Sequence, residues 1–192
     1  MKNKKYYIIA IILLAAGVFL YRVKVHPKQP NVLAQTEVHV EFPTIDTSQL
    51  SSSQQKVVSI LKQEFDSQPD GKKYSEGSSE PWCSDFVSWV YREAGKPLTN
   101  PNSGSWRIPG TVTLRDYYQS KGKFKSAASG YSPKVGDIML YDNPSHFGHH
   151  VNIVVKNEGG IITTVGGNEP GGIRVYVHTP PDGEGFLGYG IF

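Results

Sequence analysis

The 192-residue sequence contains a single cysteine, Cys83. One thiol cannot form an intrachain disulfide, and it also excludes a zinc site built on several thiolates. Charged residues are sparse, at 19% of the chain, while hydrophobic residues reach 38%. This balance is typical of a folded globular chain and argues against general disorder. The length suits one ordinary domain with an appendage and is too short for two full domains.

Most of the chain also lacks an excess of positive charge. Positions 1–30 hold six of the 20 lysine and arginine residues and no acidic residue. The remaining positions therefore carry 14 basic residues against all 17 acidic ones. Because nucleic-acid-binding domains gather positive charge on their surface, we expect no nucleic acid among the partners of this chain.

One long uncharged run is present, residues 6–21 (YYIIAIILLAAGVFLY), and three lysines precede it. As a helix it would span about 24 Å, somewhat less than the roughly 30 Å of a bilayer's hydrocarbon core. Tyrosines at both ends favour a retained single-pass anchor over positions 1–21, because amphipathic rings settle at membrane interfaces. A cleaved signal peptide is the alternative. Either reading places the rest of the chain on the extracellular side, membrane-bound with an anchor and secreted with cleavage.

Residues 22–53 are polar and interrupted by three prolines, which predicts an extended linker. A single domain then covers residues 54–192. Apolar periodicity and turn residues predict helices over 54–65, 80–94 and 113–121, followed by strands over 137–141, 151–155, 161–165, 173–178 and 186–192. Because the strands follow the helices and do not alternate with them, an α+β fold with an antiparallel sheet is expected.

Cys83 falls in the first turn of the helix predicted over 80–94, which has Pro81 at its start and Gly95 as its stop. It shares one helical stripe with Phe86, Val87, Val90 and Ala94. The unsatisfied N–H groups and the positive dipole end of a helix start favour a thiolate. The alternative is a packing role, since cysteine is among the most buried residue types.

Three histidines, His146, His149 and His150, stand just before a predicted strand. The alternation of Val151, Ile153 and Val155 makes these the apolar face, so His150 belongs to the opposite face. The histidine cluster has no acidic ligand beside it and does not predict a metal site. His178, in a later strand, is expected to face solvent.

A hairpin follows these histidines. If residues 156–160 form a five-residue loop, His150 lies opposite Gly166, and Asn168 is its neighbour on the same face. An amide oxygen at that place accepts from one ring N–H, which fixes the tautomer and leaves the other ring nitrogen to serve a thiol.

Four segments, PWCSDFVSWVYREAG, PKVGDIMLYD, GHHVNIVV and ITTVGGN, together resemble the CHAP domain, the cysteine, histidine-dependent amidohydrolases/peptidases of the NlpC/P60 superfamily. The resemblance covers about residues 54–192 and implies a papain-like fold. It implies that Cys83 is the nucleophile and His150 the general base. The doubled histidine leaves His149 as an alternative, although the strand alternation agrees with His150. No cofactor is implied.

The sequence departs from the family pattern at two positions. Many relatives have a glutamate two residues before the asparagine of the last segment, where this chain has Gly166. We therefore expect Asn168 to orient the imidazole, with Glu169 as the alternative. Asn152 stands where relatives often have a small residue, and it is expected to line the cleft.

The resemblance and an outward-facing domain together imply peptidoglycan as the substrate. The bond cut is either the one between N-acetylmuramic acid and L-alanine or one within the peptide, and the sequence does not choose between them. Two other functions stay open. One is a non-catalytic, tethered wall-binding or assembly module, which the missing carboxylate at Gly166 favours. The other is an acyltransferase that uses the same cysteine. The sequence identifies no protein partner.

Overall fold

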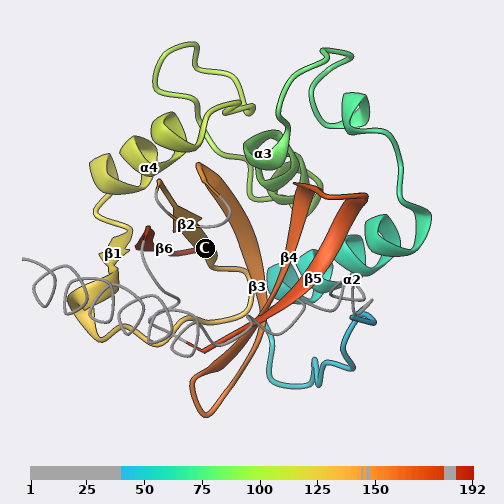
Figure 1. Ribbon diagram of the computed structural model, residues 1–192, viewed down its shortest axis with the longest axis vertical. Helices are drawn as coiled ribbons and strands as arrows, with labels where there is room; N and C mark the ends of the chain where they lie inside the picture. The colour runs from blue at the N-terminus through green and yellow to red at the C-terminus, as the bar shows by residue number, and fades with distance from the viewer. Residues whose placement is uncertain (1–39, 144, 146–147, 180–184) are drawn as a thin grey trace, which may run out of the picture. The chain divides into compact units, whose positions relative to one another are not determined.

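The computed structural model describes residues 40–143, 145, 148–179 and 185–192 (Figure 1). The predicted anchor and most of the predicted linker lie outside the described residues. The compact unit spans Val40–Phe192, and Val40, Phe42 and Ile45 pack against its core. The described unit therefore includes part of the predicted linker. Among the described residues, none of the helices has the length and apolar character needed to cross a bilayer.

The three predicted helices are confirmed, with different starting points. They are α2 (Ser52–Ser67), α3 (Cys83–Glu93) and α4 (Thr111–Ser120), accompanied by short 3₁₀ turns η1 (Gly71–Lys73) and η2 (Ala127–Ser129). A capping box between Ser51 and Gln54 begins α2. Helix α3 begins at Cys83 itself, so Pro81 precedes the helix. Gly95 follows its last turn with a φ of +78°, the left-handed geometry that ends a helix.

All strand pairs are antiparallel, as predicted for an α+β fold. The strands are β1 (Phe124–Ser126), β2 (Ile138–Tyr141), β3 (His150–Glu158), β4 (Ile161–Glu169), β5 (Gly172–His178) and β6 (Phe186–Gly190). Their order in the sheet is β1-β6-β2-β3-β4-β5. Only β1 has no counterpart in the prediction, because its three residues are too few to show an alternation.

The helices cover one face of this sheet. Helix α3 contacts β3 and β4, while α2 contacts β5 and α4 contacts β1 (Figure 1). The main core lies between these layers and contains the apolar stripe of α3 together with Val151, Ile153 and Val155, as predicted. The other face carries a smaller cluster that includes Val154 and Ile162. The face assignment of β3 is thus confirmed.

The β3–β4 hairpin is longer and tighter than predicted. Pairing continues to Glu158 and Ile161, so only Gly159 and Gly160 remain in the turn, with φ values of +59° and +90°. Two consecutive residues with positive φ make the tight turn that glycine pairs favour. The expected five-residue loop is wrong, and so is its register. Ile153 pairs with Val165, where the prediction placed position 163.

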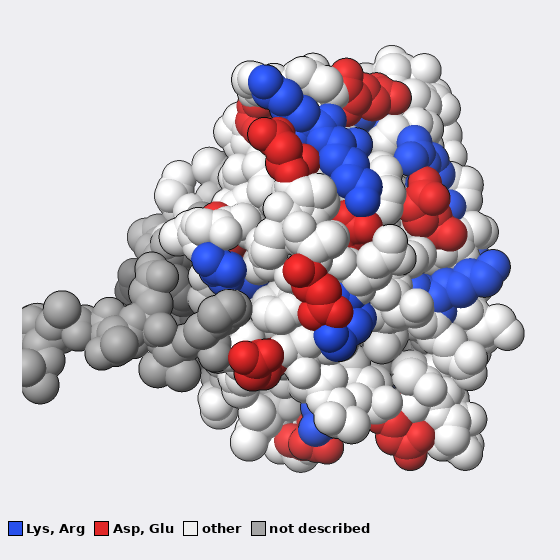
Figure 2. All heavy atoms as spheres, turned by 90° about the vertical axis from the view of Figure 1, so that its right-hand side faces the viewer, with Lys and Arg blue, Asp and Glu red and all other residues white. Residues whose placement is uncertain are grey.

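The exposed charges are of mixed sign. Figure 2 shows Lys and Arg side chains interspersed with Asp and Glu side chains over one face. Exposed pairs of opposite charge, such as Lys62 with Asp66 at 2.5 Å, recur on the surface. Each such pair contributes about 0–1 kcal/mol to the free energy of unfolding, because water screens it. The charges that matter most for chemistry are therefore the buried ones.

Candidate active site

Cys83 is the first residue of α3 and is only 5% exposed. Its side chain belongs to the core between the helices and the sheet. The N–H groups of a first helical turn have no intrahelical acceptor, so they are available to a negatively charged group beside the thiol. Local sequence sets this position, because the apolar stripe of α3 packs Cys83 inward.

His150 is the first residue of β3 and is 4% exposed. Its Nε2 atom lies 2.6 Å from Oε1 of Glu169. Burial lowers the pKa of His150, but hydrogen bonds to Cys83 and Glu169 and the attraction of both groups outweigh it and raise the pKa to about 10. The structure therefore brings Cys83 and His150 together, with the imidazolium held between a thiol and a carboxylate.

Glu169, and not Asn168, lies at the imidazole. The register between β4 and β5 shifts between Gly166 and Glu169, and Asn168 has a φ of +61° within that bulge. An extra residue in a strand breaks the alternation of its side chains. Asn168 is consequently exposed, while Glu169 turns inward and is 8% exposed. The expectation for Asn168 is wrong in this respect, and the alternative residue occupies the place.

The carboxylate of Glu169 has a second neighbour that the sequence did not reveal. The hydroxyl of Tyr176 donates to Oε2 of Glu169 at 3.3 Å. Tyr176 pairs with Thr164 across β4 and β5, so its distance from Glu169 depends on the same bulge. Asn152 was expected to line a cleft, but it is fully buried.

The other histidines of the cluster stay apart from this centre. Nδ1 of His149 lies 2.9 Å from Oδ1 of Asp142, and its side chain is half exposed. The alternation argument therefore selected the buried histidine correctly. His146 lies outside the described residues. Within the part of the chain that the structure describes, no three histidine, cysteine or acidic residues are grouped so as to hold a metal ion.

Residues 74–168 match the family model of the CHAP domain. The chain contains a CHAP domain. The match includes Cys83 and His150 and ends one residue before Glu169. A comparison with curated proteins finds no match to the chain. The carboxylate beside His150 thus comes from just beyond the matched segment.

In the CHAP domain, a partly buried arginine connects the start of α3 with the loop before it. Nε of Arg107 lies 2.8 Å from Oδ1 of Asp85, and its terminal nitrogens contact Glu80 and Glu76. Burial and, to a lesser extent, the Glu76 carboxylate raise the pKa of Asp85 to about 7. Sequence reasoning missed this cluster because Arg107 is distant in the chain. It holds in place the turn that carries Cys83.

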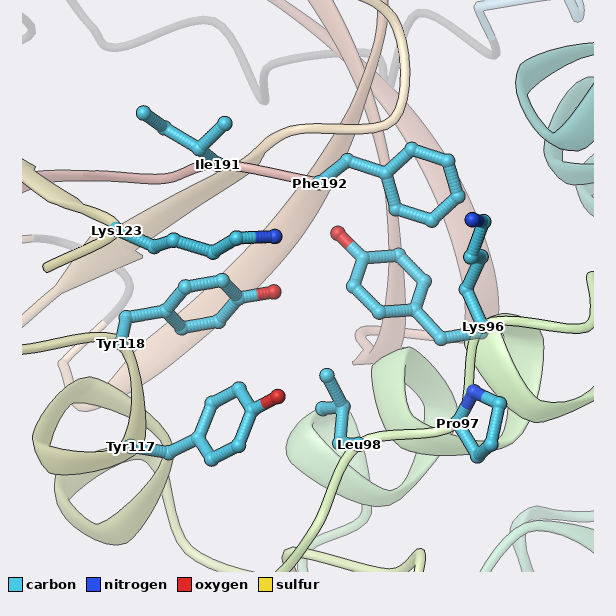
Figure 3. A pocket seen from close by; sticks show the side chains of 9 residues that line it. Lys96, Pro97, Leu98, Tyr117, Tyr118, Lys123, Ile191 and Phe192 are labelled. Atoms are coloured by element: carbon cyan, nitrogen blue, oxygen red, sulfur yellow. The ribbon is translucent and has the colours of Figure 1, made fainter. Parts of the chain in front are cut away.

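A hollow of about 150 Å³ lies at the opposite end of α3, past its last turn. Figure 3 shows Lys123 and the hydroxyls of Tyr117 and Tyr118 pointing toward this space. Leu98 and Phe192 are also among its lining residues. Since α3 runs for 11 residues between this hollow and Cys83, the hollow is separate from the candidate site.

Proposed function

We propose that this protein is a peptidoglycan hydrolase that cleaves an amide bond through a cysteine-bound acyl intermediate. The observation that carries the proposal is the placement of His150 between Cys83 and Glu169. A thiol, an imidazole and an orienting carboxylate in this order form the constellation used for nucleophilic catalysis. CHAP domains are generally hydrolases, which supports the same conclusion.

The first half of the reaction forms the acyl-enzyme. The Cys83 thiolate attacks the amide carbonyl carbon, a sulfur–carbon bond forms, and the carbonyl electrons move onto oxygen. Backbone N–H groups at the start of α3 stabilise this oxyanion. When the tetrahedral intermediate collapses, the carbon–nitrogen bond breaks and the His150 imidazolium gives its proton to the leaving amine. A pKa of about 10 keeps that proton on His150 at neutral pH.

The second half releases the acyl group. Neutral His150 takes a proton from water, and the resulting hydroxide attacks the thioester carbon. The sulfur–carbon bond then breaks, which yields a carboxylic acid and restores the thiolate–imidazolium pair. Glu169, at 2.6 Å from Nε2, stabilises the imidazolium at both stages and is not itself required to take the proton. The chemistry needs no cofactor.

The arrangement supports the papain-like fold implied by the sequence resemblance. In both, a helix presents the nucleophile from its first turn and an antiparallel sheet presents the histidine. We assign the substrate to the peptide part of peptidoglycan, cut either at the N-acetylmuramoyl-L-alanine bond or within the peptide. Gly166, which favoured a non-catalytic module, does not deprive the site of a carboxylate, because Glu169 supplies one. The hydrolase is therefore better supported than the binding module.

The decisive test is release of soluble fragments from purified peptidoglycan by the full chain. We expect lysis by the natural sequence and none by Cys83→Ala, with both proteins showing the same melting temperature. Mass spectrometry of the fragments then identifies the bond, because amidase cleavage frees the L-alanine amino group and endopeptidase cleavage does not. Lysis by Cys83→Ala contradicts the proposal. Binding without release indicates a wall-binding module, and product transfer to an added amine indicates an acyltransferase.

The proposed location is the outer side of the cell membrane. Its support is the uncharged run over residues 6–21 with lysines before it. Protease added to intact wall-depleted cells is expected to digest the CHAP domain, while the amino-terminal segment stays in the carbonate-washed membrane. Recovery of a shortened chain in the medium indicates cleavage of a signal peptide. Protection of the domain from external protease contradicts the outward orientation.

A further inference from the structure

A fully buried amide lies against the proposed catalytic groups. Asn152 is two residues after His150 in β3 and has no exposed surface. One terminal atom of its amide lies 2.8 Å from Nε2 of His150, 3.1 Å from Oε1 of Glu169 and 3.0 Å from the carbonyl oxygen of Val151. Whether the amide attracts or repels these groups depends on which of its two terminal atoms, the oxygen or the nitrogen, faces them.

The hydrogen-bond network decides which atom that is. With oxygen in this position, the amide would direct an acceptor at a carboxylate and a carbonyl, and such buried repulsion is costly. With nitrogen there, the N–H groups of Asn152 donate to Oε1 of Glu169 and to the Val151 carbonyl. The same nitrogen also lies 2.8 Å from Nε2 of His150, and it can donate there only when that ring nitrogen carries no proton. Oε1 of Glu169 then accepts from both His150 and Asn152, while Oε2 accepts from Tyr176.

Gly166 makes this arrangement sterically possible. A Cβ atom built on Gly166 overlaps the side-chain amide of Asn152 and comes within 2.6 Å of Oε1 of Glu169. Its backbone is not in the left-handed region, so space and not conformation requires glycine here. Asn152 occupies the volume that any side chain at position 166 would need.

We propose that Asn152 is a positioning residue for Cys83 and His150, and that it acts by holding the Glu169 carboxylate against Nε2 of His150 in the space that Gly166 leaves open. The proposal deepens the proposed function, since the site it concerns is the same one. Asn152 transfers no proton. It fixes the carboxylate oxygen that stabilises the imidazolium, and the imidazolium in turn stabilises the Cys83 thiolate.

The first experiment measures alkylation of Cys83 by iodoacetamide across pH in the full chain. Asn152→Leu keeps the branched, four-heavy-atom outline of the side chain and removes its hydrogen bonds. We expect the rate of Cys83 alkylation near pH 6 to fall about tenfold. We also expect the rise of that rate with pH to begin at a higher pH. Asn157→Leu is the matched control, because the Asn157 amide donates to Ser132 and Pro133. An unchanged dependence of the alkylation rate on pH in Asn152→Leu overturns the proposal. If Asn152→Leu does not fold, the same measurement is made on Asn152→Ala.

A double-mutant cycle separates positioning from packing. If Asn152 acts through Glu169, Asn152→Leu slows alkylation in the natural background and adds little in a Glu169→Ala background. An equal slowing in both backgrounds contradicts a role through Glu169. Nitrogen-15 NMR of His150 gives an independent readout, because loss of the held carboxylate changes the Nε2–H signal and a distant packing defect does not.

The space requirement is tested at Gly166. We expect Gly166→Ala to lower the melting temperature and slow alkylation, and Asn152→Ala in the same chain to restore part of the melting temperature. If Gly166→Ala leaves the melting temperature and the alkylation rate unchanged, Asn152 does not fill the space beside Gly166. None of these readouts uses peptidoglycan. If the alkylation effects appear and no hydrolysis is found, the positioning role stands and the hydrolase proposal fails.

Discussion

Two buried histidines in the same sheet have different surroundings. His150 is 4% exposed and His178, on β5, is 3% exposed. The ring nitrogens of His178 lie against two hydroxyls, Tyr141 at 3.3 Å and Thr164 at 2.8 Å. The ring of His150 lies between Cys83 and the Glu169 carboxylate. The expectation that His178 faces solvent is wrong, because β5 turns that residue toward the second core cluster.

The difference teaches that burial alone does not identify a reactive histidine. A neutral hydroxyl can satisfy an imidazole nitrogen without supplying the net charge that holds an imidazolium. A carboxylate and an ionisable thiol supply that charge, and they raise the pKa of His150 despite its burial. The ring of His150 is thus expected to respond to pH and to substitution of the thiol or the carboxylate beside it.

The largest expected effect comes from replacing His150 by glutamine, and the same replacement of His178 is the comparison. His150→Gln removes the proton carrier, so hydrolysis of peptidoglycan should fall by about 1,000-fold or more. His178→Gln should leave the rate within about threefold once the folded fraction is taken into account, because no step uses that ring. Dye release from labelled peptidoglycan by both full-length variants, with circular dichroism for folding, measures the contrast. Equal losses of hydrolysis in the two variants would contradict a catalytic role that is specific to His150.

The next effect concerns the carboxylate beside His150. Glu169→Gln keeps the shape and removes the charge, and hydrolysis should fall by about 100-fold because the imidazolium loses its stabilising partner. The neighbouring Asn168→Ala should change the rate by less than about twofold, since that side chain is exposed. The same dye-release assay compares the two. A greater loss in Asn168→Ala would restore the prediction made from the sequence.

The pH dependence of stability sharpens the comparison. The folded pKa of His150, about 10, lies above its ordinary value of 6.5. Its contribution to the free energy of unfolding is therefore fully present below about pH 6.5 and is lost as pH rises through about 10. Urea unfolding across this range should show a loss on the order of 5 kcal/mol. The loss should persist in His178→Gln and vanish in His150→Gln; persistence in both contradicts the assignment to His150.

The smallest expected effect is at Tyr176, which contacts the Glu169 carboxylate. Its hydroxyl donates to Oε2 of Glu169 at 3.3 Å, so Tyr176→Phe removes one of the bonds that hold the carboxylate. Hydrolysis should fall by about three- to tenfold, which corresponds to about 1 kcal/mol. Tyr131→Phe serves as the control, because that hydroxyl donates to Asp137 instead. An unchanged rate of hydrolysis in Tyr176→Phe would show that the remaining contacts hold Glu169 sufficiently.

Much of the fold followed from local patterns. The stripe of α3 and the alternation of β3 depend only on residue spacing, and both faces agree with the core found in the structure. The same alternation separated His150 from His149. The exact ends of the elements did not follow, because caps such as Ser51 compete with equally suitable neighbours. The register of the β3–β4 hairpin depends on whether residues 156–158 pair with β4. Contacts between the two strands decide this pairing, and the sequence of one strand does not.

The amino-acid sequence by itself determined the candidate pair, Cys83 and His150, and the α+β class, since each depends on periodicity and on chemistry carried by single residues. Only the tertiary structure decided which carboxylate meets the imidazole. A bulge at Asn168 turns Glu169 inward, and the amide of Asn152 fills the space above Gly166. Both outcomes depend on contacts between strands, and residue spacing along one strand does not encode them.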